Sequence, residues 1–194
     1  AGKKLSQARR KAAPKLETLV RRHLSDLGFA QAGFSMAFED LADPSPEGFE
    51  HIEFLFSPNP GEPERPLRAI ASSGEISRVM LALKTSLAAQ DSVPILIFDE
   101  IDRGVGGATA DAVGRRLAEL AQSGQVLVVT HSAQVAALGD AQFQVSKHQT
   151  DSHTVSRIKQ LDREERVDEI ARMISGTQVT DAARVAAQTL IAGR

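Results

Sequence analysis

The chain has 194 residues, of which 42% are hydrophobic and 25% charged, and this composition suits one globular domain with a sizeable core. A net charge of −2 excludes a general basic surface for nucleic acid, so any such contact has to be local. The absence of cysteine excludes disulfide bonds and cysteine-ligated zinc, and fits a reducing cytosol. Because no apolar stretch is long enough to cross a bilayer and no signal peptide opens the chain, we expect no membrane partner.

The first predicted element is an amphipathic helix from about Lys3 to Leu27. Apolar residues recur at three-to-four spacing, with Pro14 as a kink or start and Gly28 as the terminator. The pattern is typical of the end of a coiled-coil arm, residues 1–27, and equally of a surface helix packed on the domain. Its basic residues could contact phosphate, although an exposed coiled-coil face explains them better: Lys3, Lys4, Arg9, Arg10, Lys11, Lys15, Arg21 and Arg22.

Two strands and a long loop are predicted next. Apolar residues alternate with small or polar ones over residues 34–38 and again over residues 52–56, which is typical of half-buried strands. Residues 43–46, with two prolines, predict the turn between them. A loop with four prolines covers residues 57–66.

From Ser73 onward, helices alternate with strands. One face of the first helix carries Ile76, Val79, Met80, Leu83 and Leu87. We predict strands at 94–98, 125–129, 142–147 and 154–158, and helices at 109–122, 164–174 and 180–191, with a short helix after residue 131. This order favours parallel pairing through right-handed crossovers, and so predicts an α/β fold with a mainly parallel sheet flanked by helices.

The most informative segment is residues 95–98, four apolar residues that lead directly into Asp99 and Glu100. Such a run predicts a parallel strand buried on both faces, and these strands present ligands at their carboxyl ends. The glycine-rich residues 103–107 follow, and glycine lets the backbone approach a ligand closely. The alternative is that the two carboxylates merely cap a loop.

Two further segments place polar residues at the ends of a predicted helix and a predicted strand. Small residues from Ser72 onward open a helix, where free amides and the helix dipole favour phosphate; a capping box of Ser72 and Glu75 explains the same residues. His131 follows the apolar strand at 125–129, where an imidazole beside the carboxylate pair could contact a phosphate oxygen. A lone histidine is more often structural.

In this order, the three segments resemble the second half of an ATP-binding-cassette ATPase head in the SMC-like branch. Residues 71–84 and 98–102 are similar to the RecN family of bacterial DNA repair proteins, and residues 59–61 and 129–137 extend the resemblance. The resemblance implies ATP hydrolysis with Mg²⁺, nucleotide-gated dimerisation of two heads, DNA as a partner in double-strand-break repair and recombination, and a cytoplasmic, nucleoid-associated location.

The resemblance also implies residue roles. Asp99 would hold Mg²⁺, Glu100 would activate the attacking water, and His131 would sense the γ-phosphate. The signature motif, which contacts ATP on the opposite subunit, would be Ser72, Ser73, Gly74 and Glu75. The D-loop, which lies across the dimer interface, would include Asp102, Arg103, Gly104, Gly106 and Gly107. Ser73 stands where the family usually has glycine, and Gly106 stands where many relatives have Asp.

A phosphate-cradling P-loop is missing from the sequence. The chain has one Gly-Lys step, Gly2-Lys3, and Lys4 follows it where the motif needs Ser or Thr. RecN-like proteins carry the P-loop in an N-terminal lobe, joined to the C-terminal lobe by a long coiled coil. Since the chain also begins without methionine, we expect residues 28–194 to be that C-terminal lobe, with negligible affinity for nucleotide on its own.

Two other functions remain open. Ser73 and Gly106 motivate a structural tether or interaction module with a degenerate nucleotide site. A transporter cassette fits less well, because such subunits carry the P-loop on the same domain and usually end the signature motif with glutamine, where this chain has Glu75.

Overall fold

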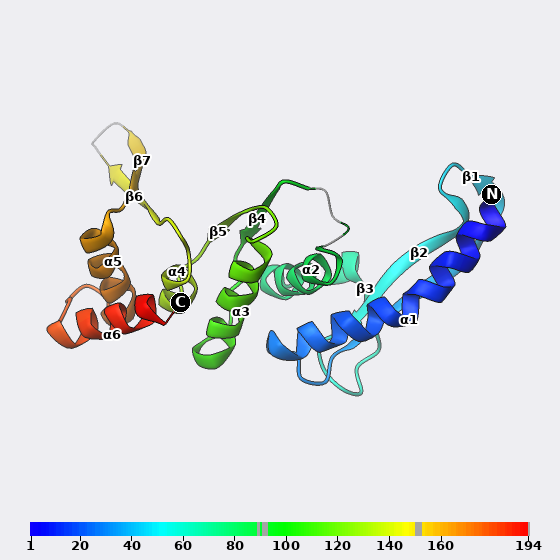
Figure 1. Ribbon diagram of the computed structural model, residues 1–194, viewed down its shortest axis with the longest axis horizontal. Helices are drawn as coiled ribbons and strands as arrows, with labels where there is room; N and C mark the ends of the chain where they lie inside the picture. Colours follow the sequence, from blue (N-terminus) through cyan, green and yellow to red (C-terminus); the bar gives the residue numbers. More distant parts are fainter. Residues whose placement is uncertain (89, 91–92, 150–152, 194) are drawn as a thin grey trace.

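The computed structural model describes residues 1–88, 90, 93–149 and 153–193, and its elements follow one another along an elongated chain (Figure 1). At one end lie α1 (Gly2–Asp26), β1 (Gly33–Ser45), β2 (Gly48–Ser57) and β3 (Arg65–Pro66). The middle holds the short helix η1 (Leu67–Ala69), α2 (Ser73–Leu87), β4 (Ile95–Asp99), α3 (Gly107–Leu120) and β5 (Gln125–Val129). The other end holds α4 (Ala133–Ala137), β6 (Phe143–Gln149), β7 (Thr154–Gln160), α5 (Arg163–Ser175) and α6 (Asp181–Ala192).

The predicted N-terminal helix is confirmed, and it runs without interruption through Pro14, which is therefore not its start. Val20 and Leu24 are fully buried on one face of α1. The helix ends as expected, because Gly28 has a φ of +91° and the Phe29 amide donates to the carbonyl of Leu24 at 3.0 Å. None of the described helices is both long and apolar enough to cross a membrane.

The two predicted strands are confirmed as β1 and β2, which pair antiparallel in a hairpin with Phe34 opposite Phe56. The predicted turn at residues 43–46 is wrong in extent, because β1 continues to Ser45 after an irregularity in register between Asp40 and Ser45. The chain reverses just before Gly48, whose φ of +128° suits glycine. The Ser45 hydroxyl closes this turn by donating to the Gly48 carbonyl at 3.2 Å.

β4 and β5 pair in parallel, from Ile95 opposite Gln125 to Asp99 opposite Val129. Within the described part of the chain this is the one parallel pairing, since β1–β2–β3 and β6–β7 are both antiparallel. The expectation of a mainly parallel sheet is therefore wrong. β6 and β7 follow each other closely in the chain, and a parallel pair would need a crossover of a dozen or more residues between them.

The β4–β5 sheet is covered on one face. Leu96, Phe98, Val126 and Val128 alternate inward and pack in a core with α1, α2, α3 and the hairpin. The opposite face consists of apolar side chains that are 45–69% exposed: Ile95, Ile97, Leu127 and Val129. Burial on both faces, expected from the apolar run, is therefore wrong for this chain by itself, because nothing in the described residues packs on the second face.

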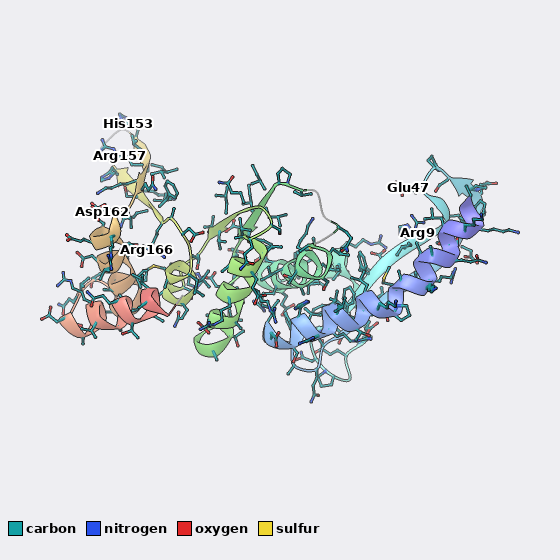
Figure 2. The ribbon with its side chains drawn as sticks, viewed as in Figure 1. Arg9, Glu47, His153, Arg157, Asp162 and Arg166 are labelled. Atoms are coloured by element: carbon teal, nitrogen blue, oxygen red, sulfur yellow. The ribbon has the colours of Figure 1, made fainter. Side chains whose placement is uncertain are left out.

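A second, smaller core joins α4, α5 and α6 around Ile170 and small alanines. Arg166 of α5, labelled in Figure 2, fixes the end of α4 by donating to the carbonyls of Ala137 at 2.7 Å and Gly139 at 2.6 Å. Asp162, labelled beside it, begins α5 with a reciprocal capping box to Glu165.

Candidate functional site

The serine-rich turn forms the first part of the site. Ser72 is the N-cap of α2, and its hydroxyl accepts the Glu75 amide at 3.4 Å. Gly74 is buried, and a Cβ at this position would lie 2.9 Å from the carbonyl oxygen of Arg103 and 3.2 Å from that of Glu100. Residue 74 therefore has to be glycine for the turn after β4 to pack on α2.

The two carboxylates lie at the carboxyl end of β4, where the sequence places them. Asp99 is exposed at the last pair of the parallel ladder, and its carbonyl accepts the Ser77 hydroxyl at 2.9 Å. Glu100 turns the chain away from the sheet with a φ of +55°, a left-handed conformation that costs energy for a residue with a side chain. Such strain is typical of sites where a side chain has to be aimed.

The Glu100 carboxylate lies against the start of α2 and is held by two side chains. The Ser73 hydroxyl donates to Oε2, and Arg103 Nη1 donates to Oε2 at 3.0 Å and to Oε1 at 3.2 Å. The Ser73 hydrogen bond, followed by the hydrogen bond and charge of Arg103, lowers the pKa of Glu100 below its ordinary value. Glu100 is therefore a charged side chain at neutral pH.

Asp102 links the acidic turn to the loop that carries the histidine. Its side chain is fully buried, and Oδ2 accepts the Thr130 hydroxyl, the His131 amide at 3.1 Å and the Ser132 amide at 2.9 Å. His131 Nδ1 lies 3.4 Å from Oδ1, while the histidine side chain is 75% exposed. The resemblance places Asp102 in a loop across a dimer interface, and this buried anchoring role was missed.

Arg78 is a second residue that the sequence reasoning missed. It lies buried in α2, and its Nη1 donates to the carbonyls of Arg103 at 3.1 Å and Ile101 at 3.5 Å. Burial lowers its pKa below the ordinary value of arginine. Two residues from Ile76, Arg78 lies on the side of the predicted helix opposite its apolar face, so the sequence pattern signals neither its burial nor the carbonyls that it reaches.

The glycine-rich turn connects this region to α3. Gly104 and Gly107 have φ values of +75° and +54°, so both positions favour glycine. Gly106 is the N-cap of α3, and a Cβ built there meets no atom within 4 Å. The structure thus brings five of the predicted residues into two contact groups, Ser73–Glu100–Arg103 and Asp102–His131, and Thr130 joins the second. The backbone of residues 100–103 links the two groups.

Among the site residues, Asp99 decides whether this region suits a Mg²⁺ ion. Within residues 1–88, 90, 93–149 and 153–193, no group of three or more His, Asp or Glu side chains is arranged to hold a metal ion. Mg²⁺ is commonly held by one or two carboxylates together with phosphate oxygens and water. The exposed Asp99 suits one such ligand, and the remaining ligands would come from nucleotide and from groups outside the described residues.

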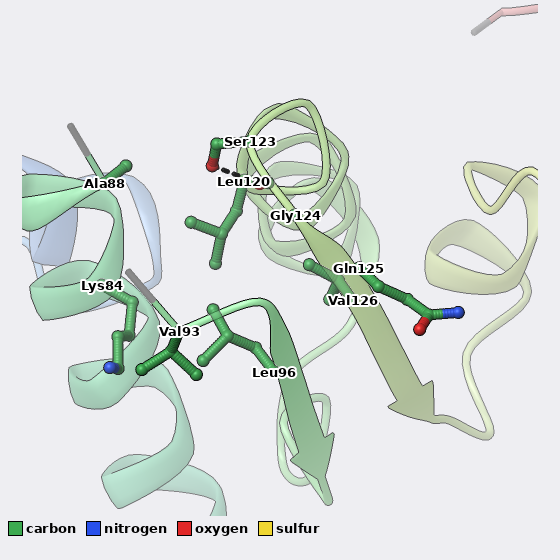
Figure 3. A pocket seen from close by; sticks show the side chains of 9 residues that line it. All are labelled: Lys84, Ala88, Val93, Leu96, Leu120, Ser123, Gly124, Gln125 and Val126. Carbon is green, nitrogen blue, oxygen red and sulfur yellow. Dashed lines mark hydrogen bonds between the residues drawn. The ribbon is translucent and has the colours of Figure 1, made fainter. Parts of the chain in front are cut away.

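A small cavity lies at the opposite, amino-terminal end of the same strands (Figure 3). It measures about 20 Å³ and is lined by Leu96, Leu120 and Val126 among others, with Lys84 at its side. This space is enough for about one water molecule and far too small for a nucleotide.

Comparison with known proteins identifies relatives, although no protein-family model matches the chain. The chain is 44% identical to the DNA repair protein RecN of Xylella fastidiosa (strain 9a5c) over 193 residues, which cover 98% of this chain and 35% of that protein. The fold is similar to the Smc head domain with a coiled coil and joint of Pyrococcus yayanosii, with a TM-score of 0.59 and 21% identity over 82% of this chain and 29% of that one.

A second solved chain is covered along nearly its whole length. It comes from a study of ATP-driven dimerization and DNA-stimulated activation of SMC ATPases, with a TM-score of 0.51 and 22% identity over 89% of this chain and 98% of that one. The chain thus has the fold of part of an SMC head, and it spans about a third of the length of the curated relatives that it matches.

Proposed function

Because the chain is a RecN homologue over nearly its whole length, we propose that it is the C-terminal half of an SMC-like ATPase head in DNA double-strand-break repair and recombination. Residues 28–194 would form the lobe, and residues 1–27 would form the end of its coiled-coil arm. ATP would be hydrolysed only when a P-loop lobe from the remainder of the protein completes the site.

The observation that carries this proposal is the meeting of three motifs at one edge of the β4–β5 sheet. Glu100 contacts Ser73 at the start of α2, and Asp102 fixes the loop of His131. Side chains for metal binding, water activation and phosphate contact are therefore grouped where parallel strands present ligands.

The exposed apolar face of the β4–β5 sheet supports the proposal of a second lobe. Four neighbouring apolar side chains at 45–69% exposure are unusual for a sheet, and a contiguous patch of this kind marks an interaction surface: Ile95, Ile97, Leu127 and Val129. A P-loop lobe is the partner proposed for this face.

In the assembled head, Glu100 would accept a proton from the attacking water, and Asp102 would aim His131 toward the terminal phosphate. Bound Mg²⁺, with Asp99 as one ligand, would neutralise charge on the phosphates. Ser72 and the backbone at Gly74 would contact ATP held by the opposite head, so that nucleotide gates the homodimer. DNA is a partner proposed from the relationship to the DNA repair proteins.

The test is ATP turnover by this chain assembled with the P-loop lobe of the same protein. We expect Glu100→Gln to lower kcat by at least about 100-fold, the usual contribution of a positioned general base. Glu39→Gln, an exposed glutamate on β1 far from α2, is the matched control and should retain full turnover. A kcat that is unchanged in Glu100→Gln, or the absence of turnover in the assembled protein, would support the non-enzymatic tether.

A further inference from the structure

The proposed base, Glu100, is already engaged by neighbours within this chain. Oε2 accepts hydrogen bonds from both Ser73 and Arg103, and Oε1 accepts one from Arg103. Arg103 Nη1 also lies 3.4 Å from the Ser73 hydroxyl, so that the three side chains form one closed cluster. A carboxylate satisfied in this way has less capacity to take a proton from water.

The position of the carboxylate is also informative. Ser73 is the first residue of α2, a helix of 15 residues, so the Glu100 carboxylate lies where the helix dipole favours an anion. The proposed function assigns the same helix start to the terminal phosphate of ATP on the opposite head. Two anions at one helix start repel each other, and a bound phosphate would therefore weaken the hold of α2 on Glu100.

We propose that Ser73 and Arg103 form a latch that keeps Glu100 against α2 until phosphate from the opposite head engages the serine-rich turn. The inference rests on the proposed function, and it makes Ser73 and Arg103 positioning residues that act through Glu100. It also gives a role to the serine that replaces the usual glycine, because glycine has no hydroxyl with which to hold the carboxylate.

The latch has a consequence for two heads acting together. The serine-rich turn serves ATP on the opposite head, whereas Glu100 serves ATP on its own head. Opening the latch would therefore make hydrolysis at one site depend on occupancy of the other. The left-handed backbone of Glu100, at a φ of +55°, is strained while the latch is closed, which favours movement of this residue once its side chain is released.

The kinetic test compares Ser73→Ala with wild type in the assembled two-lobe protein. Loss of the hydroxyl should raise kcat roughly twofold to tenfold, the range that one exposed hydrogen bond corresponds to, with KM for ATP unchanged within about twofold. Ser86→Ala is the matched control, since Ser86 lies on the same helix and donates to the carbonyl of Ala82. Ser73→Thr keeps a hydroxyl and should return kcat toward the wild-type value.

Arg103→Ala should also raise kcat, and the double variant with Ser73→Ala should gain less than the product of the two single effects, because both act through Glu100. An unchanged or lower kcat in Ser73→Ala, or a change confined to KM, overturns the latch.

A readout without turnover separates this inference from the proposed function. In this chain alone, at a fixed pH of about 7.5 where an ordinary carboxyl is ionised, the ¹³Cδ resonance of Glu100 should move in Ser73→Ala and stay in place in Ser86→Ala. If it stays in place in both, the latch is overturned even when the ATPase is active. If the resonance moves in Ser73→Ala but ATP turnover is unchanged in Glu100→Gln, the proposed function fails instead.

Discussion

The guanidinium of Arg78 lies over the ring of Phe29, 4.8 Å from its centre, and so joins the helix of the serine-rich turn to the residue just beyond the arm helix. The same guanidinium holds the carbonyl of Arg103. Phe29 in turn meets Phe56 of the hairpin edge-on, with ring centres 5.3 Å apart. One buried cation therefore connects the arm, the hairpin and the acidic turn.

We expect Arg78→Ala to lower the free energy of unfolding by about 2–3 kcal/mol, because it removes hydrogen bonds from a charged group and a cation–π contact in the core. Arg115→Ala removes an exposed arginine paired with Asp111 one turn earlier in α3, and should cost about 0.5 kcal/mol or less. Urea unfolding of both variants measures the difference. Equal losses would contradict the role of Arg78.

Gly74→Ala tests the packing of the acidic turn on α2. A methyl group 2.9 Å from the Arg103 carbonyl has to displace backbone, so we expect a loss of about 1–3 kcal/mol in unfolding free energy. Gly106→Ala has open space and is the control, with a cost of about 1 kcal/mol or less at a helix N-cap. Thermal and urea unfolding of the two variants should rank them in this order, and the reverse order would count against the packing argument.

The secondary structure was largely predictable, because the spacing of apolar residues along the sequence differs between helices and strands. The bounds of β5 match the predicted strand at 125–129, and α5 and α6 each lie within a residue or two of their predicted ranges. The edge of the sheet where Asp99 and Glu100 lie was also predictable, since parallel strands present their carboxyl ends together.

Tertiary relationships were not predictable in the same way. The contacts of Asp102 with residues 130–132 and of Arg78 with Arg103 join positions more than twenty residues apart, and no local pattern encodes them. The apolar run at Ile95–Phe98 predicts burial on both faces, because the sequence alone does not distinguish an apolar side chain that the chain itself covers from one that it leaves exposed.

The exposed face of the β4–β5 sheet predicts a substitution that weakens association while leaving the stability of the chain nearly unchanged. Ile97 is 69% exposed, so Ile97→Lys should change the unfolding free energy of this chain by about 0.5 kcal/mol or less. Binding to the P-loop lobe, measured by calorimetry, should weaken by at least about tenfold, as expected for a central apolar contact.

Val185→Lys on α6 is the control, because Val185 is 61% exposed but lies away from the sheet. It should leave association unchanged. If both lysine variants bind the lobe as well as wild type does, the β4–β5 face is not the docking surface.

His23 predicts a pH dependence of stability. Burial, and then the nearby charge of Arg116, lower the pKa of His23 below 6.5 in the folded chain. The unfolded chain therefore binds the proton more readily, so stability is full above about pH 6.5 and decreases as the pH falls toward the lowered pKa. Urea unfolding at pH 7.5 and 5.5 measures this loss.

His23→Gln should remove that part of the loss. The unfolding free energy of wild type relative to the variant should therefore be lower at pH 5.5 than at pH 7.5. The lowered pKa of Glu169, caused first by its hydrogen bond with Arg172, acts in the acid range below 4.5 and does not interfere. A wild-type-to-variant difference that is the same at both pH values would contradict the assignment to His23.

We propose that this chain supplies Asp99 and Glu100 while another lobe holds the triphosphate. Calorimetric titration of Mg-ATP into residues 1–194 alone, and into the same chain assembled with the P-loop lobe, tests this division. We expect no measurable binding to the chain alone and saturable binding to the assembled protein. Saturable binding of ATP by the isolated chain would contradict it.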